Sequence, residues 1–249
     1  MTNQTNTTNT TNHKKTTLSI IIPVYNEKNT LHKILRKVEN VKIPGVEKEI
    51  ILVDDCSTDG TRDRIRKYEN KYKVLYHKIN QGKGAAVRTG LTKAKGDILV
   101  VQDADMEYDP EDLKKLIRPI LLGKTKVVYG NRFANVKFEL FGKNKTMHPL
   151  HYIGNRSLSI MTAILYFNKV TDMETCYKMF RKEVIKGMKL RARRFDFEPE
   201  ITSKILKRGY KILEMPIKFN PRNFEEGKKI TWKDGIKHLG YLIRYRFSD

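Results

Sequence analysis

The chain has 249 residues, of which 39% are hydrophobic and 31% charged, and its formal net charge is +22. This composition excludes a fully disordered chain, and the length suits one large α/β domain or a domain with an appendage. The charge favours a polyanionic neighbour, such as nucleic acid, an anionic membrane surface or a phosphorylated substrate. The two cysteines, Cys56 and Cys176, give no disulfide framework and fit a reducing cytosol.

The first segment is a polar tail, almost entirely Thr and Asn up to residue 13, and residues 1–17 are predicted to be disordered. It lacks the apolar run of a secretory signal. Further along, no stretch of ~20 apolar residues occurs that would cross a bilayer. We therefore expect a cytoplasmic protein.

From residue 18 onward, apolar β-branched runs alternate with segments of helical period. Strands are predicted at 18–25, 49–54, 74–76, 97–102 and 127–129, and helices at 30–41, 58–68, 85–94 and 110–122. Asp109 precedes Pro110 and is predicted to cap the last of these helices. Strands that alternate with helices imply βαβ units, so we expect an α/β fold with a Rossmann-like, mostly parallel sheet flanked by helices.

The second half of the chain has a different pattern. It is predicted to hold a basic loop at 134–147, helices at 149–167 and 231–246, and strands at 177–180 and 212–219. The last helix interleaves basic and aromatic residues, which suits a membrane interface and equally an amphipathic helix packed on the sheet. We expect a domain over 18–225 and a basic amphipathic, membrane-interface segment over 226–249, with Ile160–Phe167 as a second candidate for membrane docking.

Acidic side chains gather where predicted strands end. Asp54 and Asp55 close the second strand, and three acids follow the fourth, at Asp103, Asp105 and Glu107. In open α/β sheets, ligands bind at the carboxyl ends of the strands. Several acids there would repel one another unless a cation bound between them. Mg²⁺ and Mn²⁺ are the divalent ions that such oxygen ligands favour.

Two further turns could contact a nucleotide. Tyr25, at the end of the first strand, could stack on a planar ring, and Glu27 could accept hydrogen bonds from a base or ribose. Residues 80–84, Asn-Gln-Gly-Lys-Gly, precede a helix and resemble a phosphate cradle. This segment matches neither the Walker loop nor Gly-x-Gly-x-x-Gly.

Basic residues in the expected loops form a third group of candidates, because Arg suits bidentate recognition of phosphate. They are Arg132, Arg156, Arg222, Lys228 and Lys229. Together they would balance a site loaded with substrate phosphates, although each alone is typical of an ordinary surface charge.

Other classes of function fit less well. The histidines show no His-Glu-x-x-His spacing, and Gly-x-Ser-x-Gly does not occur. The charge of +22 would also suit a nucleic-acid-binding module. Acidic strand ends in the ligand crevice argue against that module, so we expect no nucleic-acid partner.

Taken in order, the motifs resemble family 2 glycosyltransferases of the GT-A fold. The resemblance is carried by Ile21–Glu27, Val53–Gly60, Asn80–Gly84 and Asp103–Asp105, and covers residues 18–133 most strongly. Later segments are similar to the dolichyl-phosphate mannose synthase branch, in its stand-alone type without membrane spans. These segments are Thr171–Phe180, Phe197–Glu200, and Pro216–Arg222 followed by Gly227–Lys229.

The resemblance implies an inverting, metal-dependent transfer of a hexosyl group from a nucleotide sugar to a polyprenyl (dolichyl) phosphate. The donor could be GDP-mannose, UDP-glucose or UDP-N-acetylglucosamine. The enzyme would work as a peripheral protein at the cytoplasmic face of the membrane. A family 2 enzyme acting on a saccharide or protein acceptor is the alternative.

The resemblance also implies roles for individual residues. The nucleotide sugar would be held by Pro23, Tyr25, Glu27, Val53, Asp55, Lys83, Asp103 and Ala104. Asp103 and Asp105 would form the DxD element, and Asp105 and Glu107 would bind the metal, although Gln is the usual residue at position 107. Phosphates would be bound by Arg132, Arg222 and either Lys228 or Lys229. Asp103, Asp105 and Arg132 would be catalytic.

This assignment makes chemical sense without a catalytic histidine. A phosphomonoester carries about −1.5 to −2 charges at neutral pH and needs no general base. The demanding step is the departure of the nucleoside diphosphate, whose charge requires a cation.

Overall fold

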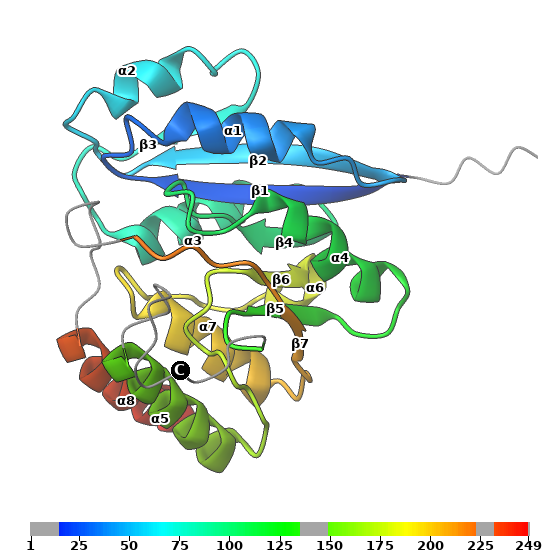
Figure 1. Cartoon of the computed structure of the whole chain (residues 1–249), viewed down its shortest axis with the longest axis vertical. Coiled ribbons are helices and arrows are strands. Elements are labelled where there is room, and N and C mark those ends of the chain that lie inside the picture. Colours follow the sequence, from blue (N-terminus) through cyan, green and yellow to red (C-terminus); the bar gives the residue numbers. More distant parts are fainter. Residues whose placement is uncertain (1–14, 135–148, 223–231, 249) are drawn as a thin grey trace, which may run out of the picture.

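The computed structural model of the chain describes residues 15–134, 149–222 and 232–248. Within them lies a sheet of seven strands in the order β3–β2–β1–β4–β6–β5–β7 (Figure 1). The strands are β1 (Thr16–Val24), β2 (Val46–Asp54), β3 (Lys73–Tyr76), β4 (Ile98–Val101), β5 (Val127–Asn131), β6 (Lys178–Arg181) and β7 (Leu213–Pro216).

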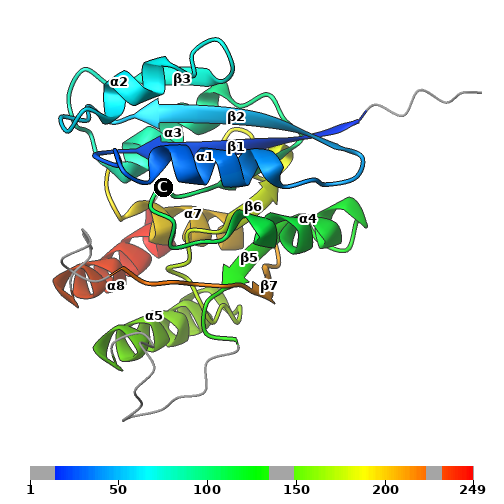
Figure 2. The same cartoon turned by 45° about the horizontal axis from the view of Figure 1, so that its top comes forward.

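Helices cover both faces of this sheet. They are α1 (Leu31–Asn40), α2 (Thr61–Arg66), α3 (Lys83–Lys93), the 3-10 helix η1 (Pro110–Asp112), α4 (Leu113–Leu121), α5 (Pro149–Tyr166), α6 (Lys182–Ile185), α7 (Phe197–Lys207) and α8 (Trp232–Phe247). In both views α1 and α4 lie on one face, and α3 and α7 lie on the other (Figures 1 and 2).

The core forms where these layers meet. Ile20, Ile21 and Ile22 are successive residues of β1 and all are fully buried, because a strand covered on both faces has no solvent side. Gly90 of α3 packs directly against Ile21 of β1. A Cβ atom added at Gly90 would lie only 2.4 Å from Ile21 Cγ2. The helix can therefore approach the central strand closely only with glycine at this position.

Because β6 runs antiparallel to its neighbours, the residues before it lie at the edge of the sheet where the other strands end. β1, β2, β3 and β4 are mutually parallel, and β5 is parallel to β7. β6 lies between the two groups and is antiparallel to both β4 and β5. The carboxyl ends of the six parallel strands consequently share one edge, and β6 begins there, so residues 171–177 lie at that edge too.

α5, α7 and α8 form a helical layer beside the sheet (Figures 1 and 2). α8 packs against α5 and α7. Leu242 and Tyr245 are buried, and the Tyr166 hydroxyl of α5 donates a hydrogen bond to the Leu242 carbonyl oxygen at 2.8 Å. α8 thus packs on helices rather than on the sheet, which differs from the alternative considered from its sequence.

Most of the elements predicted from sequence are present, with shifted ends. The helix expected from residue 58 begins only at Thr61, because Gly60 has φ +90°, a left-handed conformation that ends helical geometry. Asp109 caps the following helical segment as predicted, since its side chain accepts from the Glu111 amide. α6 and α7 were not predicted. Ten of the eleven α7 residues are buried, so α7 has no amphipathic pattern.

Three sequence-based expectations lie outside the described residues: the tail over 1–14, most of the basic loop at 134–147, and the pair Lys228 and Lys229. The domain boundaries at 18–225 and 226–249 stay predictions. Among the helices that are described, none combines the length and the apolar character needed to cross a bilayer.

Candidate active site

A tight turn after β4 carries the acidic motif. Met106 has φ +68°, a left-handed conformation that is rare for a residue with a side chain and concentrates at functional sites. This turn brings Asp105 and Glu107 together, and the Glu107 amide donates to Asp105 Oδ1 at 3.1 Å. Their side chains are 16% and 19% exposed, so both carboxylates lie largely out of water.

Arg222 lies among the acids of this turn. Its Nη2 is 3.0 Å from Glu27 Oε1 and 3.1 Å from Asp105 Oδ2. Its Nε is 4.0 Å from Glu107 Oε1, and its backbone amide donates to the same Glu107 oxygen at 2.8 Å. One guanidinium therefore balances three carboxylates from the turns after β1 and β4, as the predicted repulsion among clustered acids requires.

The acids of the turn bind protons more readily than ordinary carboxyls. Burial, followed by the charges of Asp103 and Glu107, raises the pKa of Asp105 to about 7. Burial also raises the pKa of Glu107, against the opposing hydrogen bond from the Arg222 amide. Both groups would gain from an additional cation, because it would favour their charged forms.

The donor chemistry of Asp105 and Glu107 fits a hard divalent ion. Within the described residues, no group of three or more His, Cys, Asp and Glu is arranged to hold a metal. Mg²⁺ and Mn²⁺ sites at phosphates commonly use only one or two carboxylates, with waters and phosphate oxygens completing the coordination. The Arg222 guanidinium already places a positive charge within 4.0 Å of an oxygen of each of these two side chains.

Asp103, the first acid of the motif, has a different partner. Lys83 at the start of α3 lies 2.9 Å from Asp103 Oδ1, and 3.4 Å from Glu198 Oε1 of α7. Glu198 is 5% exposed and its second oxygen is buried with no hydrogen-bond partner in the described structure. The Cys176 thiol lies beside Asp103, and burial followed by that charge raises the pKa of the thiol well above its usual range.

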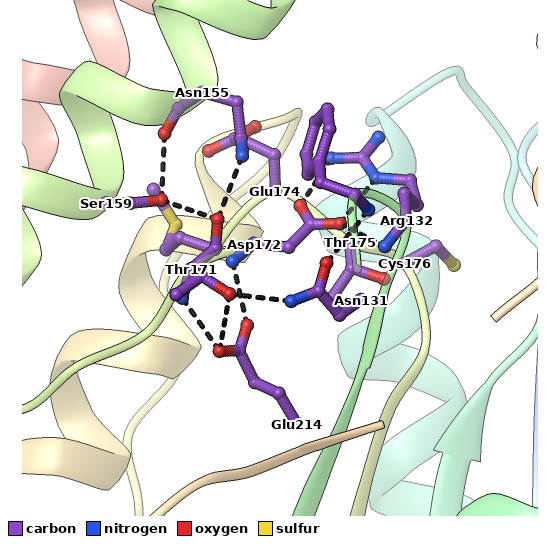
Figure 3. A network of polar contacts seen from close by, with 12 residues as sticks. Asn131, Arg132, Asn155, Ser159, Thr171, Asp172, Glu174, Thr175, Cys176 and Glu214 are labelled. Atoms are coloured by element: carbon purple, nitrogen blue, oxygen red, sulfur yellow. Dashed lines mark hydrogen bonds and ion pairs between the residues drawn. The ribbon is translucent and has the colours of Figure 1, made fainter. Parts of the chain in front are cut away.

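Arg132 directly follows β5 and forms a bidentate ion pair with Asp172 (Figure 3). The two bonds measure 2.9 Å from Nε and 2.7 Å from Nη2, and the Arg132 backbone amide donates to the same carboxylate. Its guanidinium carbon also lies 5.2 Å from the ring centre of Phe219. Burial opposes the charge, but Asp172 keeps the pKa of Arg132 above its usual range.

The loop that carries Asp172 is held from several elements (Figure 3). Glu214 of β7 accepts from the Thr171 amide, the Thr171 hydroxyl and the Asp172 amide at 2.7–2.9 Å. Asn131 of β5 donates to the Thr171 hydroxyl at 2.6 Å, and Asn155 of α5 donates to the Thr171 carbonyl. Arg132 is therefore fixed by a network rather than by one exposed pair.

A pocket of about 180 Å³ lies beside this network, between β5 and α5. Arg156 is among its lining residues, which are Asn131, Phe133, Ala134, Asn155, Arg156 and Thr171. The pocket places Arg156, one of the predicted basic candidates, close to the loop that holds Arg132.

The residues expected to hold a nucleotide differ in their accessibility. Tyr25 and Pro23 are partly exposed at the end of β1. Glu27 accepts a hydrogen bond from the Thr30 hydroxyl at 2.6 Å and pairs with Arg222. Val53 is fully buried and Ala104 is 3% exposed, so neither side chain offers a surface to a ligand, and only the backbone of these two residues could contribute.

Asp55 ties the predicted phosphate loop to the end of β2. Its carboxylate accepts from the amides of Gln81 and Gly82 at 2.9 and 2.7 Å and lies 2.7 Å from His77 Nδ1. The amides of Gly84 and Ala85 donate to carbonyls of residues 194 and 193. Three amides of the segment 80–84, and that of Ala85 after it, are thus already bonded within the protein in this conformation, and the interpretation of 80–84 as a phosphate cradle stays a prediction.

The family model for "Glycosyl transferase family 2" matches residues 19–188. This match spans the sheet edge with Asp103, Asp105, Arg132 and Asp172. The chain belongs to glycosyl transferase family 2. The predicted class of enzyme, a family 2 glycosyltransferase, is therefore confirmed.

Three relatives are about 30% identical to this chain over the aligned residues. The chain is 31% identical to a dolichol-phosphate mannosyltransferase of Pyrococcus furiosus over 91% of its own length and 63% of that protein. It is 32% identical to a UDP-N-acetylglucosamine–dolichyl-phosphate N-acetylglucosaminyltransferase of Methanococcus voltae, covering 91% of this chain and 93% of the relative. A dolichyl-phosphate beta-glucosyltransferase of Trichomonas vaginalis is 29% identical, over 91% of this chain and 72% of that one.

Solved structures confirm the fold. Glucosyl-3-phosphoglycerate synthase from Mycobacterium tuberculosis, in complex with Mn²⁺, UDP and phosphoglyceric acid, superimposes with a TM-score of 0.69, covering 94% of this chain and 80% of that one at 18% identity. The same enzyme with Mg²⁺ and UDP gives a TM-score of 0.66 at 19% identity, covering 94% and 80%. The expected α/β, GT-A architecture is therefore confirmed.

Sequence reasoning missed several residues of this family 2 site. Asp172, Glu198 and Glu214 lie in segments with no acidic strand-end pattern, and their partners are far away in the chain. The family-like segments Thr171–Phe180 and Phe197–Glu200 contain the first two, which was the available signal. Their roles depend on Arg132 and Lys83, and those contacts are made only in the folded protein.

Proposed function

We propose that the protein transfers a hexosyl group from a nucleotide sugar to a polyprenyl phosphate, with inversion at the anomeric carbon. The observation that carries this proposal is the joint position of Asp105, Glu107, Arg222 and Arg132 at one edge of the sheet. Two largely buried acids that suit a divalent cation lie beside two guanidinium groups that suit phosphates. Three relatives in the family are named for dolichyl-phosphate acceptors, which supports a lipid phosphate as the acceptor.

The chemistry follows from the charges. An acceptor phosphate is already a nucleophile, so the site needs no residue to remove a proton. Arg132 and Lys83 hold positive charge at this edge of the sheet and would orient the phosphates of donor and acceptor. Mg²⁺ or Mn²⁺ held by Asp105 and Glu107 would stabilise the charge of the departing nucleoside diphosphate.

The identity of the donor is proposed only as a class. The named relatives transfer mannose, glucose and N-acetylglucosamine, so GDP-mannose, UDP-glucose and UDP-N-acetylglucosamine are the candidate donors. Tyr25 and Glu27 at the end of β1 would contact the nucleoside, with Lys228 and Lys229 of the segment after Arg222 as further phosphate ligands.

The acceptor requires contact with a membrane, and α5 and α8 offer the surface for it. Ile160, Ile164 and Phe167 are 52%, 63% and 88% exposed at intervals that place them on one stripe of α5 and its end. Ile243 and Phe247 are 45% and 81% exposed on α8. Exposed apolar side chains on adjacent helices, flanked by Arg244 and Arg246, suit docking at the cytoplasmic surface of an anionic membrane.

The proposal is tested with radiolabelled GDP-mannose, UDP-glucose and UDP-N-acetylglucosamine, each with dolichyl or undecaprenyl phosphate, with and without Mn²⁺. We expect label in the lipid phase with one donor, dependent on the divalent ion and lost in Asp105→Asn. Transfer to a saccharide or protein, with none to either lipid, would favour the alternative acceptor and contradict the proposal.

A further inference from the structure

We propose that Arg222 is a resident counter-cation of the Asp105–Glu107 pair, which a divalent ion displaces, and that the released guanidinium then binds the acceptor phosphate. This inference rests on the proposed function, because it assigns an order of events to the same site. It goes further in giving Arg222 two alternative positions, one among carboxylates and one at a phosphate.

The contacts show that the guanidinium and a divalent ion would compete for the same oxygens. Arg222 Nη2 lies 3.1 Å from Asp105 Oδ2, and the Arg222 amide uses Glu107 Oε1 at 2.8 Å. An ion bound by these carboxylates would share their lone pairs with the guanidinium, and two cations at this range repel. Because the same Glu107 oxygen accepts from the Arg222 amide and lies 4.0 Å from its Nε, an ion bound by Glu107 and Asp105 would weaken both of these contacts and leave Glu27 as the guanidinium's remaining carboxylate partner.

The segment before Arg222 is anchored independently of the carboxylates. Phe219 forms a β-bridge with Tyr108, and their ring centres are 5.3 Å apart. The Lys218 amide donates to Asp112 at 2.6 Å. These contacts would keep the chain in place up to Phe219 while Arg222 moves, so the released guanidinium remains at the same edge of the sheet, where Phe219 also packs against Arg132.

The exchange has a functional consequence. While Arg222 is paired with Glu27, Asp105 and Glu107, these carboxylates neutralise its positive charge. The guanidinium then binds an acceptor phosphate only weakly. Entry of the metal-bound donor would make that charge available. The site would therefore bind the donor before it binds the acceptor phosphate strongly, which protects the donor from reaction in an incomplete site.

The first test measures Mn²⁺ binding by electron paramagnetic resonance, without nucleotide or lipid. Arg222→Gln should bind Mn²⁺ roughly tenfold more tightly than the wild-type protein, because the competitor is gone. Lys83→Gln is the matched control, since it removes one positive charge from Asp103 without vacating the space between Asp105 and Glu107. An equal gain in the control, or no gain in Arg222→Gln, would overturn the exchange.

The second test follows the position of Arg222 directly. Trypsin must take the guanidinium into its own acidic pocket to cleave after Arg222, so we expect cleavage there to be slow without metal and faster with Mn²⁺. Arg194, which is exposed, gives an internal reference that Mn²⁺ should not change. The increase in cleavage rate with Mn²⁺ should be lost in Asp105→Asn. If Mn²⁺ does not change the rate of cleavage after Arg222 in the wild-type protein, the proposal is overturned.

Neither test uses the lipid acceptor, so the outcomes separate the two proposals. Mn²⁺ binding and trypsin cleavage as expected, together with no labelling of either lipid, would reject the polyprenyl-phosphate acceptor and retain only the displacement of Arg222 by the metal. Equal Mn²⁺ binding by the wild-type protein and by Asp105→Asn would show that Asp105 does not bind the metal. That result would overturn the exchange.

Discussion

Lys83 Nζ lies 2.9 Å from Asp103 Oδ1, so the first residue of α3 is bonded to the first acid after β4. The helix brings a cation to the acidic edge of the sheet, and Glu198 supports it from α7 at 3.4 Å. These contacts tie α3 and α7 to the acidic turn and give Lys83 the role of a positioning residue for Asp103.

Lys83→Gln should therefore lower transfer by roughly 10- to 100-fold, the usual cost of removing an orienting partner at such a site. Steady-state kinetics with a saturating donor would measure it. Lys93→Gln at the exposed end of the same helix is the matched control and should retain wild-type rates. Equal rates for both variants would show that Lys83 does not position the motif.

The buried pair of Arg132 and Asp172 should dominate local stability. Asp172→Asn leaves a buried guanidinium without its carboxylate, and we expect unfolding by urea to lose about 3–5 kcal/mol. The double variant Arg132→Met with Asp172→Leu should recover much of this loss, because both charges are gone, but not the transferase activity. A double variant as active as the wild-type protein would contradict a role for Arg132 in phosphate binding.

The raised pKa of Asp105 makes the stability of the metal-free protein depend on pH. With a pKa of about 7, the folded protein keeps this proton where the unfolded chain, whose Asp titrates near ~4, has lost it. The folded state thus binds more protons between these values, and stability falls as the pH rises through that window.

Urea midpoints in EDTA at pH 5 and pH 8 would measure this effect. Asp105→Asn should be more stable than the wild-type protein at pH 8 and close to it at pH 5. Asp63→Asn on the exposed face of α2 should leave the pH dependence unchanged. If Asp105→Asn kept the wild-type slope, another group would be responsible.

Membrane docking through α5 and α8 predicts that charges on their exposed apolar stripes weaken binding to vesicles. Phe167→Glu should lower partition into phosphatidylglycerol vesicles by roughly tenfold or more, since a Phe side chain contributes about 1.5–3 kcal/mol on burial. Leu122→Glu, at an exposed apolar position after α4 that lies outside α5 and α8, is the control.

Vesicle sedimentation measures this binding, and nucleotide binding should be unchanged in both variants. Equal partition of Phe167→Glu and the wild-type protein would exclude this surface. Deletion of residues 231–249 is a poorer test than these point variants, because Leu242 and Tyr245 are buried against α5 and α7, and their loss would damage the fold.

The amino-acid sequence by itself determined the strands and helices of the first half and the place of its acids. Apolar runs such as Ile20–Ile22 mark buried strands, and parallel strands joined by helices must end at one edge. Asp55, Asp103 and Asp105 could therefore be assigned to that edge from local pattern alone. The family resemblance follows from these same local motifs.

Only the tertiary structure decided which charges meet. Glu27 and Arg222 are 195 residues apart, and Arg132 meets Asp172 only because β6 runs antiparallel and brings residues 171–177 to the same edge. The occupation of the Gln81 and Gly82 amides by Asp55 and the packing of α8 on helices were likewise settled by folding. The physical reason is that hydrophobic period specifies an element and its buried face, whereas strand direction and side-chain partners depend on how distant elements pack.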